Sequence, residues 1–247
     1  MKEIFKKTLL GIGILIALIV IFIVGYMLKA KSEIKKMTPT ETKEIIANIY
    51  SIKDSFTNMY LIKDSATYIA IDAGNDLEVI SEELKKLNIK PDQVTAVLLT
   101  HTDADHVAAL SLFKNAEVYL SKQEEQLLTG EKSRFLFFGN TIDAEEYTLI
   151  EDQQIFNIGN LKIQGILTPG HTVGAMCYLV DDKYLFVGDV LSIKDGKIDK
   201  FNTFANTDTK TAIKSIALIT KLPYAEYIFT AHYGYTNNYK TAVESWK

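Results

Sequence analysis

Seven side chains of this 247-residue chain have the types and spacing to bind metal ions. They include all four histidines of the chain. The seven are His101, Asp103, Asp105, His106, His171, Asp189 and His232. Imidazole nitrogens and carboxylate oxygens are ligands that zinc and harder divalent cations accept. The pattern therefore predicts a hydrolytic site that holds two metals.

Four predicted strands end shortly before these side chains in the sequence. Short apolar, β-branched or aromatic runs are typical of buried strands. Such runs cover residues 94–100, 162–167, 184–188 and 227–230, each zero to three residues before His101, His171, Asp189 and His232, respectively. In the first group, H-T-D-A-D-H, a tight turn that opens a helix near Ala104 would direct its side chains inward. Residues 106–113 have helical periodicity, and ligands at strand ends are held by a rigid element.

Each residue taken alone has a simpler explanation. A histidine beside an apolar strand is usually a hydrogen-bonded structural residue, Asp103 or Asp105 could cap a helix, and Asp189 could belong to a turn. We prefer the metal site because no histidine is left over and because each group ends a predicted strand.

The motifs resemble those of the metallo-β-lactamase superfamily of metallo-hydrolases, from about Ile45 to His232. In order they are I-D-A-G (71–74), L-L-T-H-T-D-A-D-H (98–106), L-T-P-G-H-T (167–172), F-V-G-D (186–189) and T-A-H (230–232). The resemblance implies a first metal held by His101, Asp103 and His171, a second held by Asp105, His106 and His232, and Asp189 as the bridge. It also implies that Asp72 supports the ligands without being one.

Position 103 departs from the common motif H-x-H-x-D-H of this family. With Asp103 as a ligand, three carboxylates, one hydroxide and two divalent cations sum to a charge of about zero instead of about plus one. We therefore expect a less acidic metal-bound water and more tolerance of manganese or iron.

Composition favours one catalytic domain, residues 41–247, after a membrane segment, residues 1–40. No linker or repeat divides the chain, and 47% of its residues are hydrophobic. The formal net charge of −4, without a long basic run, argues against a nucleic-acid partner. The single Cys177 lies in an apolar strand, where we expect it to be packed and not to bind metal.

The N-terminal segment has the length of a membrane helix. Residues 8–28 carry no charge, and at about 1.5 Å per residue they match a hydrocarbon thickness of about 30 Å. A cleaved signal peptide is the alternative, but the apolar stretch is longer than a signal core, and no small-x-small cleavage site follows it. We expect a single-pass anchor with the catalytic domain on the extracytoplasmic side, because a short basic N-terminus usually stays in the cytoplasm.

Alternating strand and helix signals predict an α/β fold. Strands are expected at residues 45–52, 58–62, 67–71, 154–156 and 161–167, hairpin turns at 181–183 and 195–197, and helices at 76–87 and 208–222. The strand and helix signals occur in both the N-terminal and the C-terminal half of the domain. If each half forms a sheet with helices on one face, the two predict a sandwich with the metals at the strand ends. The resemblance implies the same four-layer αββα sandwich of the metallo-β-lactamase fold.

We expect a membrane-anchored hydrolase of small molecules. Two divalent ions, Zn²⁺ first and manganese or iron as alternatives, would polarise the substrate while a bridging hydroxide attacks an ester, thioester, lactone or phosphoester bond. Asp105 and Asp189 are the expected catalytic residues, with Asp105 orienting the hydroxide. Two alternatives remain open: an iron-dependent redox enzyme of the persulfide dioxygenase or flavodiiron kind, and a non-catalytic membrane protein that binds metal.

Some branches of this family fit less well. Thioester hydrolases of the glyoxalase II type have a C-terminal helical region, and 15 residues follow His232 here. The nucleases carry a large insertion, and 42 residues separate Asp189 from His232. The second-metal cysteine of many β-lactamases and their basic partner for the lactam carboxylate are not evident.

Specificity should reside in loops. Residues 132–140 combine the chain's only arginine, Arg134, with an apolar run, which could line a pocket, touch the membrane or form core under a loop. Tyr233 and Tyr235 could donate a hydrogen bond to an oxyanion, although packing is the simpler role for both.

Overall fold

The computed structural model describes residues 2–223, 225–244 and 246, in two compact units, Met1–Met37 and Thr38–Lys247. The first unit is helix α1 (Lys2–Ile34). Among the described residues, one helix, Glu3–Ile34, is long and apolar enough to cross a membrane. A signal sequence near the N-terminus would meet the same criteria.

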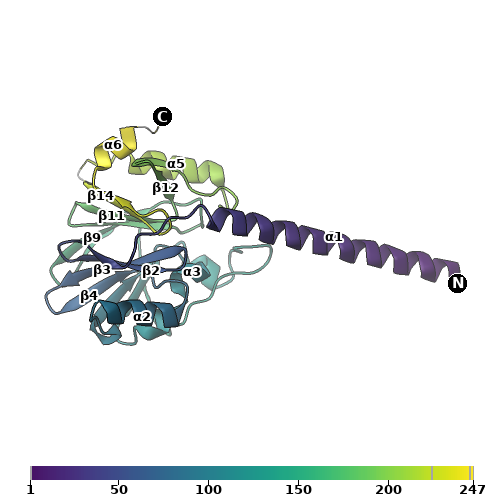
Figure 1. The fold of residues 1–247 in the computed structure, drawn as a ribbon, viewed down its shortest axis with the longest axis horizontal. Helices are drawn as coiled ribbons and strands as arrows, with labels where there is room; N and C mark the ends of the chain where they lie inside the picture. The colour runs from purple at the N-terminus through teal and green to yellow at the C-terminus, as the bar shows by residue number, and fades with distance from the viewer. Residues whose placement is uncertain (1, 224, 245, 247) are drawn as a thin grey trace. The chain divides into compact units, whose positions relative to one another are not determined.

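The larger unit contains two stacked β-sheets (Figure 1). The first sheet has the order β1-β2-β3-β4-β5-β6-β7, antiparallel from β1 to β4 and parallel from β4 to β7. Its strands are β1 (Lys43–Ile46), β2 (Ile49–Asp54), β3 (Thr57–Asp64), β4 (Thr67–Ile71), β5 (Val94–Leu98), β6 (Glu117–Ser121) and β7 (Thr148–Ile150).

The second sheet has the order β15-β14-β11-β10-β9-β8, and only the pair β11–β14 is parallel in the described part of the chain. Its strands are β8 (Ile155–Ile158), β9 (Leu161–Leu167), β10 (Met176–Val180), β11 (Tyr184–Gly188), β14 (Tyr227–Thr230) and β15 (Tyr235–Thr236). A separate hairpin joins β12 (Leu191–Lys194) to β13 (Lys197–Lys200) through Asp195 and Gly196, both with positive φ.

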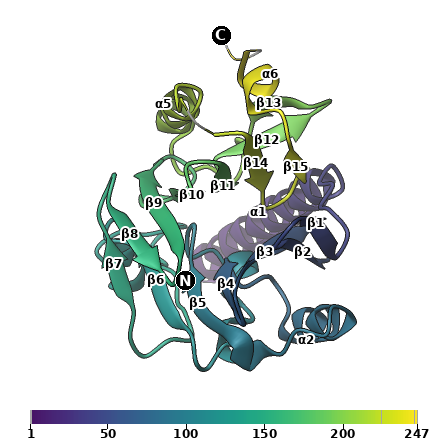
Figure 2. The same cartoon turned by 90° about the vertical axis from the view of Figure 1, so that its left-hand side faces the viewer.

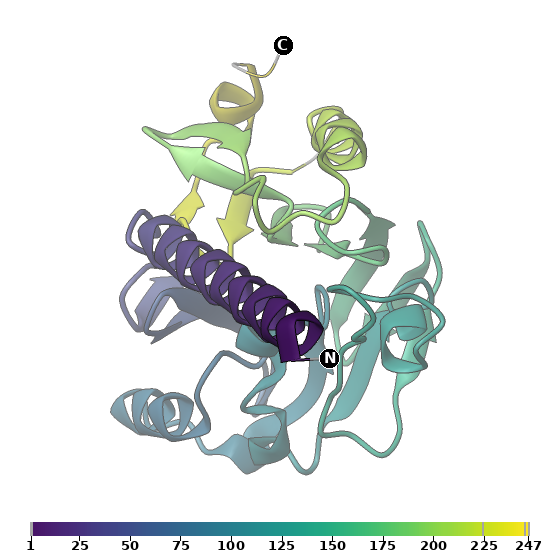
Figure 3. The same ribbon diagram turned by 90° about the vertical axis from the view of Figure 1, so that its right-hand side faces the viewer.

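Helices cover the outer faces of both sheets. Helix α2 (Leu77–Lys86) lies on the side of the first sheet (Figures 1 and 2), and so does α3 (Ala104–Val107; Figure 1). Helices α5 (Thr209–Ile219) and α6 (Tyr239–Glu244) lie on the side of the second, with the green β12–β13 hairpin (Figure 3). The shorter helices are η1 (Pro91–Gln93), η2 (Leu110–Leu112) and α4 (Glu125–Leu128). The four-layer αββα sandwich is confirmed.

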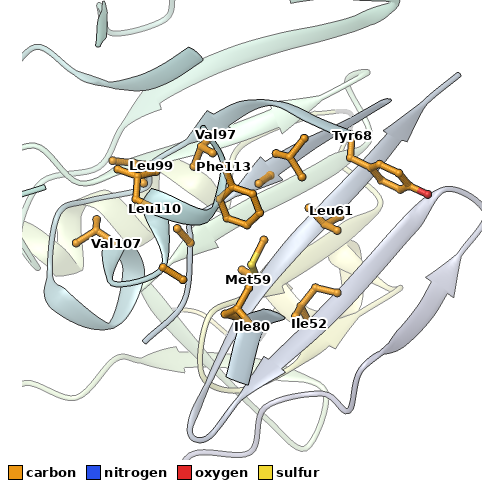
Figure 4. Packing of buried hydrophobic residues seen from close by; sticks show 14 of the residues in the cluster. Ile52, Met59, Leu61, Tyr68, Ile80, Val97, Leu99, Val107, Leu110 and Phe113 are labelled. Carbon is orange, nitrogen blue, oxygen red and sulfur yellow. The ribbon is translucent and has the colours of Figure 1, made fainter. Parts of the chain in front are cut away.

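Alternating strand residues build the three apolar layers between these elements. In β5, Val97 packs toward the helices of the first sheet, whereas Ala96 and Leu98 face the second sheet. Strand β10 does the same, with Tyr178 between the sheets and Leu179 toward α5. This period of two is the pleat of a strand that is buried on both faces. Figure 4 shows the layer under α2 and α3, in which Ile80, Leu110 and Phe113 meet β2, β3 and β5.

The single strand expected at residues 45–52 is wrong, because a hairpin interrupts it. Ile46 pairs with Ile49, so Ala47 and Asn48 form a two-residue turn between β1 and β2. Asn48 has a φ of 70°, a conformation that asparagine tolerates better than most residues. Because isoleucines lie on both sides of Ala47 and Asn48, the sequence pattern resembled one continuous apolar strand.

The helix expected at residues 106–113 divides into α3 and η2. It opens at Ala104, as predicted. The carbonyl of His106 accepts a hydrogen bond from the backbone N–H of Ala73 at 2.7 Å, so it is engaged outside the helix. A tertiary contact therefore ends the α-helix after one turn.

The hairpin turns predicted at residues 181–183 and 195–197 are confirmed, and aspartates cap helices α2 and α5. Asp76 accepts hydrogen bonds from the N–H groups of Glu78 and Val79 at the start of α2, and Asp208 caps α5 in the same way. Helix α5 ends at Ile219 instead of residue 222. Strands β6 and β7, at the parallel edge of the first sheet, were not expected.

Candidate metal centre

Four strand ends bring the seven predicted side chains together. Strands β5, β9, β11 and β14 end within four residues of the first histidine motif, of His171, of Asp189 and of His232, respectively. Three groups have ligand atoms within 4.8 Å of one another: His101 with Asp103 and His171, His101 with His106 and Asp189, and Asp105 with His106 and His232.

Asp189 lies between the two halves of the cluster. Its Oδ1 is 3.1 Å from His232 Nε2 and 3.5 Å from His106 Nε2. Its Oδ2 is 3.4 Å from His171 Nε2. Each oxygen of one carboxylate therefore faces a different set of histidines, as a bridging position requires.

Every histidine is oriented through its Nδ1 atom. His106 Nδ1 is 2.9 Å from Asp72 Oδ2, and His232 Nδ1 is 2.8 Å from the carbonyl oxygen of Phe56. The other two pairs are His171 Nδ1 with Asn206 Oδ1 at 3.2 Å and His101 Nδ1 with Thr100 Oγ1 at 3.1 Å. Since Thr100 gives its own hydroxyl hydrogen to Asp72, it accepts from His101. All four partners thus select an N–H at Nδ1 and leave Nε2 as the nitrogen that faces the cluster. The Nε2 of His171 also lies 3.4 Å from Nη2 of Arg134.

The inward-facing atoms fit divalent cations. Among the described residues, the buried Nε2 atoms of His101, His106 and His232 and the Oδ1 of Asp189 make no hydrogen bond, a costly arrangement in a buried site. Metal–ligand bonds of about 2.0–2.1 Å in a tetrahedron imply ligand separations of about 3.3 Å. His171 Nε2 and Asp103 Oδ2 are 3.2 Å apart, and His232 Nε2 and Asp105 Oδ2 are 3.4 Å apart.

Asp72 has the supporting position that the resemblance implied. Its carboxylate accepts hydrogen bonds from His106 Nδ1, from the backbone N–H of Thr100 at 2.7 Å and from the hydroxyl of Thr100. Asp72 has a φ of 62°, a rare conformation that tends to mark functional sites. Gly188 also has a positive φ, and a Cβ there would lie 2.5 Å from Thr100 Oγ1. The glycine before Asp189 thus leaves room for this network.

The charges of the cluster stabilise its ionised forms. Burial would raise the pKa of Asp189, but His232 and His106 outweigh this effect and hold that pKa well below its usual range. Burial would lower the pKa of His106, but Asp72 and Asp189 raise it well above normal. The cluster therefore gathers opposite charges in a buried space.

Asp103 has a partner that the sequence did not reveal. Arg134, from the loop after α4, donates from Nε to Asp103 Oδ1 at 2.7 Å and from Nη2 to Asp103 Oδ2 at 2.5 Å. This guanidinium places a positive charge beside Asp103 that opposes the loss of one positive charge expected from this carboxylate. The tolerance of manganese or iron stays a prediction, and the guanidinium weakens the charge argument for it.

Glu124 is a buried residue that sequence reasoning missed. Its Oε1 accepts from the N–H and the hydroxyl of Thr102, each at 2.8 Å. Its Oε2 accepts from the hydroxyl of Thr172 at 2.6 Å and the N–H of Gly174 at 3.1 Å. The carboxylate thus joins the loops that carry His101 and His171. In the sequence it belongs to a polar run, K-Q-E-E, that is typical of an exposed turn.

The remaining candidates lie outside the centre. Residues 135–138 are between 51% and 78% exposed, so the core role considered for this run is wrong. The ring of Tyr235 stacks on Phe229, in agreement with packing. Cys177 is fully buried beside Thr168, and burial raises its pKa to about 12. It is packed and lies in none of the three groups.

Known proteins share the fold and the motif region. The profile of the Metallo-beta-lactamase superfamily matches residues 52–232. The probable metallo-hydrolase MJ0296 of Methanocaldococcus jannaschii is 30% identical over 64% of this chain and 67% of its own length. The probable polyketide biosynthesis zinc-dependent hydrolase BaeB of Bacillus velezensis is 34% identical over 50% of this chain, and the match spans about half (49%) of that relative.

Solved structures agree at the level of the fold. A B3 metallo-beta-lactamase with an active-site glutamic acid has a TM-score of 0.66 and 18% identity, covering 89% of this chain and 90% of its own. The lactamase MEM-A1, from a soil metagenome library, has a TM-score of 0.62 and 18% identity, covering 78% and 80%. With the sandwich and its His/Asp centre, the profile match shows that this chain belongs to the metallo-beta-lactamase superfamily.

Proposed function

We propose that the chain is a dinuclear metallo-hydrolase of small-molecule esters, thioesters, lactones or phosphoesters. The observation that carries this proposal is the position of Asp189, whose two oxygens face two separate histidine sets. One set would comprise His101, Asp103 and His171, and the other Asp105, His106 and His232. Two divalent cations bound there would polarise the substrate and lower the pKa of a water molecule toward about 7.

Asp105 lies on the open side of this centre. Its side chain is 25% exposed, whereas those of His106 and Asp189 are at most 5% exposed. Its Oδ2 is 3.4 Å from His232 Nε2. We infer that Asp105 accepts a hydrogen bond from the attacking water and so orients it, in addition to binding the second metal. Substrate would enter from this side.

Zinc is the proposed metal. Four imidazole nitrogens suit Zn²⁺ better than a purely oxygen-rich site would. Two relatives, from Bacillus velezensis and Bacillus subtilis, are described as probable zinc-dependent hydrolases of polyketide biosynthesis. This supports the choice of metal but does not carry their substrates over to this chain.

Metal analysis of the full-length protein in detergent tests the proposal. We expect close to two zinc ions per chain by elemental analysis. A panel of ester, thioester, lactone and phosphodiester substrates should show hydrolysis that is lost after chelation and regained with zinc. A stoichiometry of one or none would contradict the dinuclear site, and firmly bound iron with an oxygen-consuming activity would favour the redox alternative.

We also propose that α1 anchors the protein as a single-pass span, with the larger unit on the extracytoplasmic side. Full-length protein should then stay in the membrane fraction after carbonate washing and keep its N-terminal residues. A charge at the centre of a span costs about 2.5–3.5 kcal/mol, so Ile16→Lys combined with Ile19→Lys should release it. Recovery of a shortened soluble form of the unaltered chain would identify a cleaved signal instead.

A further inference from the structure

The loop at residues 130–140 carries a side chain that acts on the metal centre without being one of its seven donors. Arg134 is buried to the same degree as its partner, with 17% of the side chain exposed against 18% for Asp103. Its two contacts with Asp103 form a parallel fork. Only a guanidinium has this geometry, since a lysine ammonium is a point charge on a flexible stem.

Arg134 is itself held by the segment that orients His171. Its Nη2 donates to the carbonyl of Ala205 at 2.9 Å, and its Nη1 donates to Thr207 Oγ1 at 3.1 Å. Thr207 in turn donates to the carbonyl of His171 at 2.9 Å. The arginine therefore connects the 130–140 loop to the segment before α5. Its position is set by four partners, because its Nη2 also lies 3.4 Å from His171 Nε2.

The hydrogen bonds to Asp103 determine which of its lone pairs is free. A carboxylate has about four acceptor sites, two on each oxygen. Oδ1 accepts from Arg134 Nε and from Asn140 Nδ2 at 3.0 Å, so both of its sites are used. Oδ2 accepts from Arg134 Nη2 and has one site left. That oxygen is 3.2 Å from His171 Nε2 and 3.6 Å from His101 Nε2.

We propose that Arg134 is a positioning residue that makes Asp103 a substitute for a neutral histidine ligand. It blocks Oδ1, leaves one lone pair of Oδ2 for the first metal, and cancels the carboxylate charge. This inference rests on the dinuclear site proposed above. It predicts that the contributions of the two residues to metal affinity depend on each other: replacing either residue alone should weaken metal binding.

A set of variants of the full-length protein in detergent tests this dependence. The readouts are the number of Zn²⁺ and Co²⁺ ions bound, the affinity of the weaker ion by competition with a chelator, and the visible spectrum of the Co²⁺ form. Arg134→Gln should lower the affinity for one of the two ions by about 10–100-fold, as loss of a residue that hydrogen-bonds to a metal ligand typically does. Arg134→Lys should not restore the affinity. Lys132→Gln, which removes an exposed positive charge from the same loop, should leave binding unchanged.

The decisive comparison involves Asp103→His. Alone it restores the common motif, but it leaves the guanidinium buried against histidines and cations, so metal affinity should fall by at least about tenfold. Asp103→His combined with Arg134→Gln should return the affinity to within about threefold of the unaltered protein. A role of Arg134 in folding alone would not produce this rescue, and thermal unfolding of each variant checks that the fold is kept.

Two outcomes would overturn the proposal. One is that Asp103→His alone binds two ions as tightly as the unaltered protein, and the other is that the double variant shows only the sum of the two single losses. If the unaltered protein binds fewer than two ions, the dinuclear site itself fails. If it binds two ions and Arg134→Gln binds them equally well, only the role of Arg134 fails.

Discussion

Replacing Glu124 by alanine is expected to lower the free energy of unfolding by about 3–5 kcal/mol. The substitution leaves two buried N–H groups, of Thr102 and Gly174, without their acceptor, and the hydroxyls of Thr102 and Thr172 lose theirs. Each unsatisfied group costs about 1–3 kcal/mol, although relaxation and the removal of a buried charge recover part of the sum. Thermal unfolding should shift down by roughly 10 °C.

Two further variants make this measurement specific. Glu124→Gln retains a carbonyl oxygen for Thr102 but turns an N–H₂ group toward the N–H of Gly174, so we expect an intermediate loss of about 1–2 kcal/mol. Glu151→Ala removes an exposed carboxylate that pairs with Lys122 and should cost less than about 0.5 kcal/mol. Equal small losses for all three would show that Glu124 does not join the two ligand loops.

Asp189→Asn is expected to abolish the proposed activity, with a fall in kcat/KM of at least about a thousandfold, or roughly 4 kcal/mol of transition-state stabilisation. The amide has one oxygen, so it can serve either the set with His171 or the set with His106 and His232, but not both. Metal content should fall from about two ions to about one. Elemental analysis and the rate on the best substrate of the panel measure both effects.

A surface aspartate provides the matched comparison. Asp182→Asn makes the same chemical change in a side chain that is 46% exposed and pairs with Lys162, and it should leave rate and metal content unaltered. If Asp189→Asn retained two ions and most of the rate, Asp189 would not bridge. The two metals would then have to be held by separate ligand sets.

The sequence by itself determined the positions of the strand ends and the identities of the donor residues. Apolar runs end at Leu167, Gly188 and Thr230 in the structure, within a residue or two of the predicted ends. Each is followed by its donor residue. These features are local, because strand propensity, the turn at a glycine and the type of the next side chain are each determined by a few consecutive residues. The motif order was specific enough to indicate the family.

Only the tertiary structure decided which residues support those donors. The side chains of Glu124 and Arg134 contact side chains 22 to 73 positions away in the chain, and the carbonyl of Phe56 orients His232 from 176 positions away. Nothing near these residues in the sequence marks them, since a glutamate in a polar run and an arginine in an apolar loop each have an ordinary local role. The role of Glu124 depends on buried hydrogen bonds and that of Arg134 on an opposite charge, and both arise only when the two sheets pack and bring the four strand ends together.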